Sequence, residues 1–313
     1  MLVLRRLLLG LVTLFIVSLM IFWAVELLPG DLASEVLGQS ASPETLAAFR
    51  ERFGLNDPAP QRYLAWLLGI LQGDFGLSMA TQRPIASMIG TRVFNTFFLA
   101  AYAAVIAIPL AIVLGLVAAL YRGSAVDRST SIITLAIISF PEFFVAYILI
   151  LIFSSHLGWL PSLANVSSGM PLSDRLVVTL LPAMTMVLIV VAHTMRMTRA
   201  AIVNLLASSY IEMADLKGLK RARVIVVHAL PNAIAPIATV VSLNLAYLIV
   251  GVVLVEVVFV YPGLGQLLVD SVSNRDVAVV QAACLIFAAT YIILNMLADI
   301  LSIVSNPRRL HPR

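Results

Sequence analysis

Charged residues are scarce in this sequence of 313 amino acids, since Asp, Glu, Lys and Arg together make up 12% of it. Soluble domains carry about 25% charged residues, so this shortage excludes an ordinary water-soluble protein. Cysteine is almost missing as well, and the single Cys284 excludes an internal disulfide. The four histidines stand far apart along the chain, without neighbouring ligands at metal-site spacing, so we expect no metal site.

Hydrophobic residues are abundant instead, at 61% of the chain, and they come in runs long enough to cross a bilayer. The first run follows Arg5 and Arg6, as in a signal peptide, but its length of about 22 residues favours a retained span. The sequence therefore predicts an all-α polytopic membrane protein with six transmembrane helices. The predicted spans are 7–28, 94–120, 130–154, 176–196, 233–257 and 279–304.

The distribution of positive charge predicts the orientation of these spans. Six spans place both termini on one side, together with the segments 121–129, 197–232 and 305–313. With Arg196 at the edge of a span and the arginines near the N-terminus, that side holds 13 of the 20 Lys and Arg residues. The positive-inside rule therefore predicts cytoplasmic termini. The net charge of +4 thus reflects topology, and we expect membrane lipid and no nucleic acid around this chain.

These spans divide the chain into a first transmembrane helix (1–28), an extracytoplasmic segment (29–93), a five-helix core (94–304) and a cytoplasmic tail (305–313). Within the extracytoplasmic segment, Ser42 followed by a proline and a glutamate is typical of a helix start. A second helix is predicted from Gln61 to Gln72, and its apolar side chains require either the membrane surface or the other spans. This segment is interpreted either as a docking lip or as packing.

The longest cytoplasmic loop, 197–232, is predicted to contain two short helices separated at Gly218. A glycine there supplies the left-handed turn that other residues avoid, and the second helix is expected to end before Pro231. An exposed helical pair of this kind suits insertion into another protein. The alternative is a basic connector that only fixes topology.

The residues of this loop carry a resemblance. Glu212-Met213-Ala214, then Gly218, then His228-Ala229-Leu230-Pro231 resembles the EAA motif of membrane subunits of bacterial ABC importers, with Met213 and His228 as departures from its usual residues. Motifs elsewhere resemble the dipeptide/oligopeptide/nickel permease family, and the long segment after the first span resembles its B-type member. These motifs are Pro29-Gly30-Asp31, Gly54-Leu55-Asn56-Asp57-Pro58, Gly73-Asp74-Phe75-Gly76-Leu77-Ser78, Phe140-Pro141, Leu157-Gly158-Trp159-Leu160-Pro161 and Tyr261-Pro262-Gly263-Leu264-Gly265.

This resemblance implies an ABC importer type I permease fold in the bacterial cytoplasmic (inner) membrane. It implies a second related permease subunit of C-type, two P-loop ATPase subunits and an extracytoplasmic substrate-binding protein as partners. The chain has no Gly-x-x-x-x-Gly-Lys-Ser/Thr phosphate cradle, so ATP and Mg are expected in the partner subunits and no cofactor in this one. The residues implied in coupling to the ATPase are Glu212, Met213, Ala214, Gly218, Leu219, Lys220, Arg221, His228, Leu230 and Pro231.

Ionisable and amide groups inside spans are expensive and therefore suggest function. Those in the predicted spans are Glu142, His193, Asn244, Glu256, Asn295 and Asp299. The alternative explanation is structural. The carboxylates would then lie near water or pair with a neighbouring subunit, and the His and Asn side chains would form hydrogen bonds across helices. A kink or a gate is expected at proline within a span. The candidates for a path or gate are Phe140, Pro141, Glu142, Asn244 and Glu256.

Two other functions are weighed against a permease that takes up peptides or related small solutes. A secondary transporter is expected to show inverted repeats, and no convincing internal repeat is present. A membrane enzyme needs a catalytic constellation, and the nearest sequence, Gly76-Leu77-Ser78-Met79-Ala80, lacks the closing glycine of Gly-x-Ser-x-Gly. We therefore expect a transport subunit without catalytic residues of its own, whose substrate is chosen largely by the binding protein.

Overall fold

The computed structural model describes residues 2–27, 29–38, 40–167, 169–206, 208–219 and 223–304, and these residues form helices joined by loops. The helices on the outer segment are α2 (Leu32–Leu37), α3 (Pro43–Arg52) and α4 (Ala59–Leu71). The remaining helices are α1 (Leu2–Glu26), α5 (Ile85–Leu120), α6 (Ala125–Ser139), α7 (Glu142–Leu149), η1 (Ile150–His156), α8 (Leu172–Val178), α9 (Leu180–Leu206), α10 (Ser209–Leu216), η2 (Val224–Ala229), α12 (Leu230–Val258), α13 (Leu264–Ser273) and α14 (Val277–Val304).

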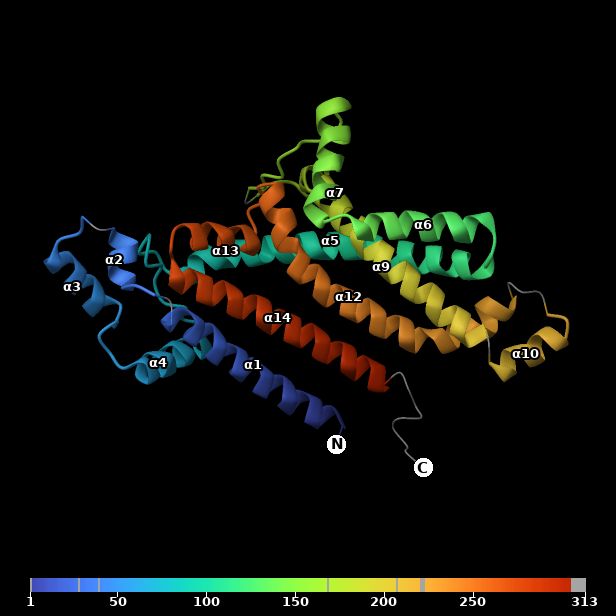
Figure 1. Ribbon diagram of the computed structural model, residues 1–313, viewed down its shortest axis with the longest axis horizontal. Helices are drawn as coiled ribbons and strands as arrows, with labels where there is room; N and C mark the ends of the chain where they lie inside the picture. Colours follow the sequence, from blue (N-terminus) through green and yellow to red (C-terminus); the bar gives the residue numbers. More distant parts are fainter. Residues whose placement is uncertain are drawn as a thin grey trace.

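The long apolar helices α1, α5, α9, α12 and α14 are each long and apolar enough to cross a bilayer, and among the described residues there is a sixth span if the bent pair of α6 with α7 and η1 is counted as one. Figure 1 shows the outer helices α2–α4 at one end of the molecule and α10 near the other. The charge pattern assigns the end carrying α10 to the cytoplasm. The prediction of an all-α membrane protein with up to six spans is confirmed.

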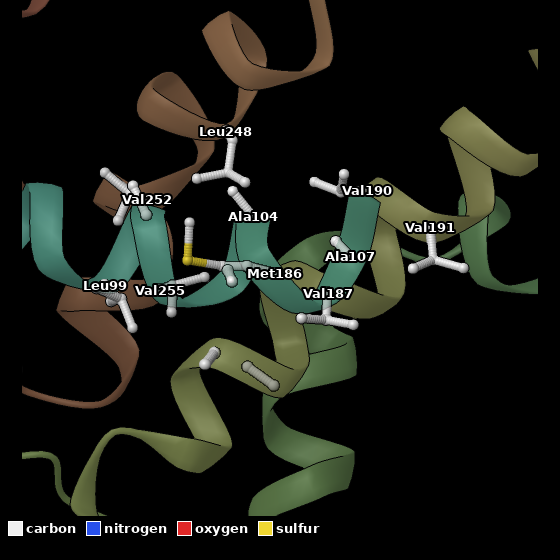
Figure 2. Packing of buried hydrophobic residues seen from close by; sticks show 14 of the residues in the cluster. Leu99, Ala104, Ala107, Met186, Val187, Val190, Val191, Leu248, Val252 and Val255 are labelled. Atoms are coloured by element: carbon white, nitrogen blue, oxygen red, sulfur yellow. The ribbon is translucent and has the colours of Figure 1, made fainter. Parts of the chain in front are cut away.

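α5, α9 and α12 pack closely at the centre because small residues line their contacts. Figure 2 shows Ala104 and Ala107 of α5 among larger side chains of α9 and α12, including Met186 and Val252. A side-chain carbon added at Gly115 would lie 2.8 Å from Cβ of Thr198 on α9. Small residues at such contacts let helix backbones approach each other, which is the main source of helix association in lipid.

α5 is longer than the predicted span 94–120 because its first turns belong to a second packed cluster at the outer end. Ile85 and Ile89 are buried there against Leu264 and Leu267 of α13 and against the start of α14. With 36 residues, α5 is about 54 Å long at 1.5 Å per residue, whereas the hydrocarbon core measures about 30 Å. The helix therefore extends well beyond the membrane and carries part of the outer surface.

The third predicted span, 130–154, differs most from the structure. It is divided at Phe140 and Pro141 into α6 and α7, and the two parts are bent by 105° (Figure 1). Proline has no backbone N–H and forces the residue before it into an extended conformation, and Phe140 has φ −92° and ψ 140°. Hydropathy identified the two halves as one span, and the kink expected at Pro141 is present as the break between α6 and α7.

The outer segment packs against the first span. Ser42 caps α3 by accepting a hydrogen bond from the Thr45 amide at 3.2 Å, as its sequence predicts. On α4, the buried Tyr63 hydroxyl lies 2.8 Å from the Ser18 hydroxyl of α1, and its ring lies 5.4 Å from that of Phe22. The Tyr63 side of α4 therefore lies against α1, one of the two predicted alternatives, while Leu64, Leu68 and Leu71 of α4 are exposed.

Candidate functional site

A cavity of about 530 Å³ lies between the N-terminus of α7 and the facing sides of α9 and α12. Its residues recur at helical spacing, because side chains three, four and seven positions apart share one face of a helix. α9 contributes Met186, Ile189, Val190 and His193, and α12 contributes Asn244, Tyr247, Leu248, Val250, Gly251 and Leu254. The cavity is open on one side, where the Tyr247 side chain is 64% exposed. Its size is within the range of small-molecule sites.

Glu142 brings a carboxylate into this largely apolar cavity. It is the first residue of α7, where the helix dipole favours a negative charge. Gly251 of α12 faces it, and a side-chain carbon added there would lie 3.0 Å from Glu142 Oε2. Within the described residues, the structure places no cation or hydrogen-bond donor on this carboxylate.

The cavity also holds an amide and an imidazole. Asn244 donates from Nδ2 to the Val240 carbonyl of its own helix at 3.1 Å, and Asn295 of α14 likewise donates to Tyr291 at 3.0 Å. The predicted bonds of these asparagines across helices are therefore not formed in the described chain. His193 is exposed in the cavity, although the sequence did not select it as a path residue. Its position seven residues after Met186 on the same face is the signal that identifies it.

The structure brings Glu142 and Asn244 together in the cavity and leaves the other path candidates outside its lining. Phe140 and Pro141 form the bend just before Glu142, and the Phe140 ring stacks on Phe144 with 5.3 Å between centroids. Asp299 forms an ion pair with Arg6 of α1 at 2.8 Å.

Glu256, another of the path or gate candidates, has a fully buried side chain and does not line the cavity. Its Oε1 accepts from the Thr96 hydroxyl of α5 at 2.6 Å. Its Oε2 accepts from the backbone N–H groups of Gly265 at 2.7 Å and Gln266 at 3.1 Å. These donors explain how a carboxylate is kept inside the protein. Glu256 therefore joins α12, α5 and the start of α13.

The same outer junction includes Tyr261 and Asn95. The Tyr261 hydroxyl donates to the Asn95 carbonyl at 2.8 Å, and the Asn95 side chain donates to the Pro262 carbonyl at 2.8 Å. Arg175 donates to Asn95 Oδ1 at 2.6 Å, and its guanidinium lies over the ring of Phe98 at 4.2 Å. Burial raises the pKa of Tyr261, which keeps its hydroxyl a neutral donor. The Tyr-Pro-Gly motif is therefore a buried structural junction.

The cytoplasmic loop has the predicted helix, turn and helix, with one difference. α10 ends near Gly218, whose φ of +75° is the left-handed conformation expected of a glycine. Ile211 and Val224 are buried against each other, which holds the two arms together. The second arm does not stop before Pro231, because η2 continues directly into α12 at Leu230.

Apolar side chains are exposed on the described part of this loop: on α10, Met213 is 57% exposed and Leu216 is 77% exposed, and on η2, Val226 and Val227 are exposed as well. Glu212 is exposed beside Met213, and Leu219 is partly buried under the turn. The backbones of Ala214 and His228 lie in α10 and η2. Lys220 and Arg221 lie outside the described residues. α10 lies beyond the cytoplasmic ends of the spans (Figure 1).

Comparisons with known proteins identify the family of this chain. The family model described as "Binding-protein-dependent transport system inner membrane component" matches residues 111–311. The model described as "Binding-prot-dependent transport system membrane comp, N-term" matches residues 1–100. The chain belongs to the binding-protein-dependent permease family. It is therefore a membrane permease subunit of an ABC importer and a multi-pass protein of the bacterial inner membrane.

Relatives place this permease in the peptide and nickel branch of the family. It is 37% identical over 305 residues to the glutathione transport system permease protein GsiC of Escherichia coli strain K12, covering 97% of each chain. The same values hold for GsiC of Shigella dysenteriae serotype 1. Among solved structures, this permease is similar to the MetNI methionine ABC transporter in an inward-facing form, with a TM-score of 0.56. The sequences are 14% identical, and the match covers 70% of this chain and 96% of the MetNI chain. This last similarity establishes the type I permease fold.

Proposed function

We propose that this permease translocates peptides or related small solutes of about tripeptide size, with the cavity between α7, α9 and α12 as part of the path. The observation that carries this proposal is the 37% identity over nearly the whole chain to permeases of glutathione transport systems. A cavity of about 530 Å³ with apolar walls and a few polar groups suits such a solute. Glutathione itself is the first solute to test.

The cytoplasmic loop is proposed to dock into an ATPase subunit. The exposed Met213 and Leu216 at the tip of α10 would insert into a pocket of that partner, while the buried Ile211 and Val224 keep the tip in shape. The turn at Gly218 positions the two arms. Two P-loop ATPase subunits would bind ATP and Mg, since this chain carries no phosphate cradle.

The remaining partners are proposed from the family resemblance. The chain is proposed to act as the B-type member of a pair, with a related C-type permease as its neighbour, and to receive solute from an extracytoplasmic binding protein. The open side of the cavity, where Tyr247 and Leu254 are exposed, would face that neighbour. The path would thus be completed by two permease subunits.

The test is uptake of radiolabelled glutathione and of trialanine by host cells with and without this chain. We expect the deletion to remove uptake of at least one of the two, and a plasmid copy to restore it. Unchanged uptake of both solutes in the deletion strain would contradict the proposed substrate class.

A further inference from the structure

The polar groups of the cavity lie at two levels along α12. Glu142 approaches α12 at Gly251, while Asn244 lies seven residues earlier on the same face. Seven residues of α-helix correspond to a rise of about 10 Å. α9 ends and α12 begins near α10, so the two helices run in opposite directions (Figure 1). His193, nearest the cytoplasm among the α9 lining residues, therefore lies toward the level of Asn244.

The two levels differ in chemistry. Glu142 is a half-buried carboxylate to which the described structure gives no cationic partner, and such a group binds an ammonium favourably. His193 and the second hydrogen of Asn244 Nδ2 are donors that suit a carboxylate. Between the two levels the walls are apolar, with Met186, Val190 and further aliphatic residues. A ligand with opposite charges at its ends and apolar groups between them matches this order.

We propose that the cavity binds a zwitterionic peptide in extended form, with its ammonium group at Glu142 and its carboxylate at His193 and Asn244. An extended chain of three residues spans about 10 Å, the separation of the two levels. This inference rests on the proposed function and specifies the orientation of the solute and the residues that contact it. The amino end of the peptide then points toward the outer side of the membrane.

The experiment uses the complete complex of this permease, its partner permease, the ATPases and the binding protein in proteoliposomes. Import of radiolabelled trialanine and ATP hydrolysis are measured at saturating loaded binding protein. We expect Glu142→Gln to lower the import rate about tenfold or more, the scale of a lost hydrogen bond to a charged group. Binding-protein-stimulated ATP hydrolysis should stay within about twofold of wild type, and Glu142→Asp should recover import.

Two further variants separate a contact with solute from a general effect of charge. Glu44→Gln removes a carboxylate from the exposed first turn of α3 and should leave import unchanged. Gly251→Val keeps Glu142 but places a side chain beside its carboxylate, and it should lower import as Glu142→Gln does.

Wild-type import of trialanine by the Glu142→Gln complex would overturn the proposal while leaving the proposed function intact. Failure of the Glu142→Gln complex to assemble would also overturn it, because Glu142 would then be a structural residue. Absence of trialanine import by the wild-type complex, despite ATP hydrolysis that responds to the binding protein, would overturn the proposed substrate class and this inference together.

Discussion

Removing the buried Glu256 carboxylate should destabilise the outer junction. Glu256→Ala leaves the backbone N–H groups of Gly265 and Gln266 without an acceptor in the junction. An unsatisfied buried donor costs about 1–3 kcal/mol, so the two amides together cost about 2–6 kcal/mol. Relief from burying a carboxylate offsets part of this cost, and we expect a net loss of about 3 kcal/mol. The Tm shift per kcal/mol falls with size to about 2 °C at 250 residues, so in this chain of 313 residues the loss should lower the Tm by about 6 °C or less.

Thermal unfolding of the intact complex in mild detergent measures this loss. Thr96→Val removes the hydroxyl that donates to Glu256 and accepts from the Leu264 amide at 2.8 Å. Because Thr96 and Glu256 share one hydrogen bond, the double variant should lose less than the sum of the single variants, by about 1 kcal/mol. Glu44→Ala on the exposed face of α3 is the control and should change stability by less than about 0.5 kcal/mol. A Glu256→Ala variant as stable as this control, or strict additivity with Thr96→Val, would refute the reasoning.

Two further predictions concern the helix contact at Gly115 and the ion pair of the outer segment. Gly115→Val should lower the Tm of the complex, because overpacking against Thr198 reduces the free energy of unfolding by about 1–3 kcal/mol. Gly90→Val on the same helix is the control and should leave the Tm unchanged, since no atom lies within 4 Å of its added carbon. Equal Tm values for the two variants would contradict the close packing of α5 on α9. The Arg50 guanidinium lies 2.7 Å from the Asp31 carboxylate and holds the pKa of Asp31 below its usual range. The ion pair therefore stabilises the outer segment fully above about pH 4. This stabilisation is lost as the pH falls through the lowered pKa. Limited proteolysis of the outer segment should therefore accelerate in acid, and Asp31→Asn should reduce this acceleration.

Hydropathy, charge and helix capping predicted much of this fold because each is a local property of the sequence. The long apolar runs identified the spans, and Ser42 marked the start of α3. Gly218 marked the turn of the cytoplasmic loop, where its positive φ is observed. The EAA-like spacing then gave the family, which the full-length relatives confirm.

The sequence did not reveal the angles between helices or the contacts between side chains that are far apart in the chain. Pro141 indicated a break, but the 105° bend depends on how α7 packs against α9 and α12. Glu256 was selected as a path residue because an acid in a span is unusual, and only its donors, which come from α5 and α13, identify it as a junction. His193 was one of the groups inside the spans that the sequence singled out, and the facing stripes of α9 and α12 place it in the cavity.

The central claim is that the cytoplasmic loop of this permease couples it to an ATPase. Affinity purification of the chain from its native host in mild detergent, with the co-purifying proteins identified, tests this claim most directly. Gly218→Asp and Gly123→Asp are matched variants, since both glycines have positive φ, of +75° and +82°, and neither has an atom within 4 Å of an added carbon. We predict a P-loop ATPase with the wild type and with Gly123→Asp, and its loss with Gly218→Asp while membrane insertion is retained. Undiminished recovery of the ATPase with Gly218→Asp, or a wild-type preparation without any ATPase, would contradict the account.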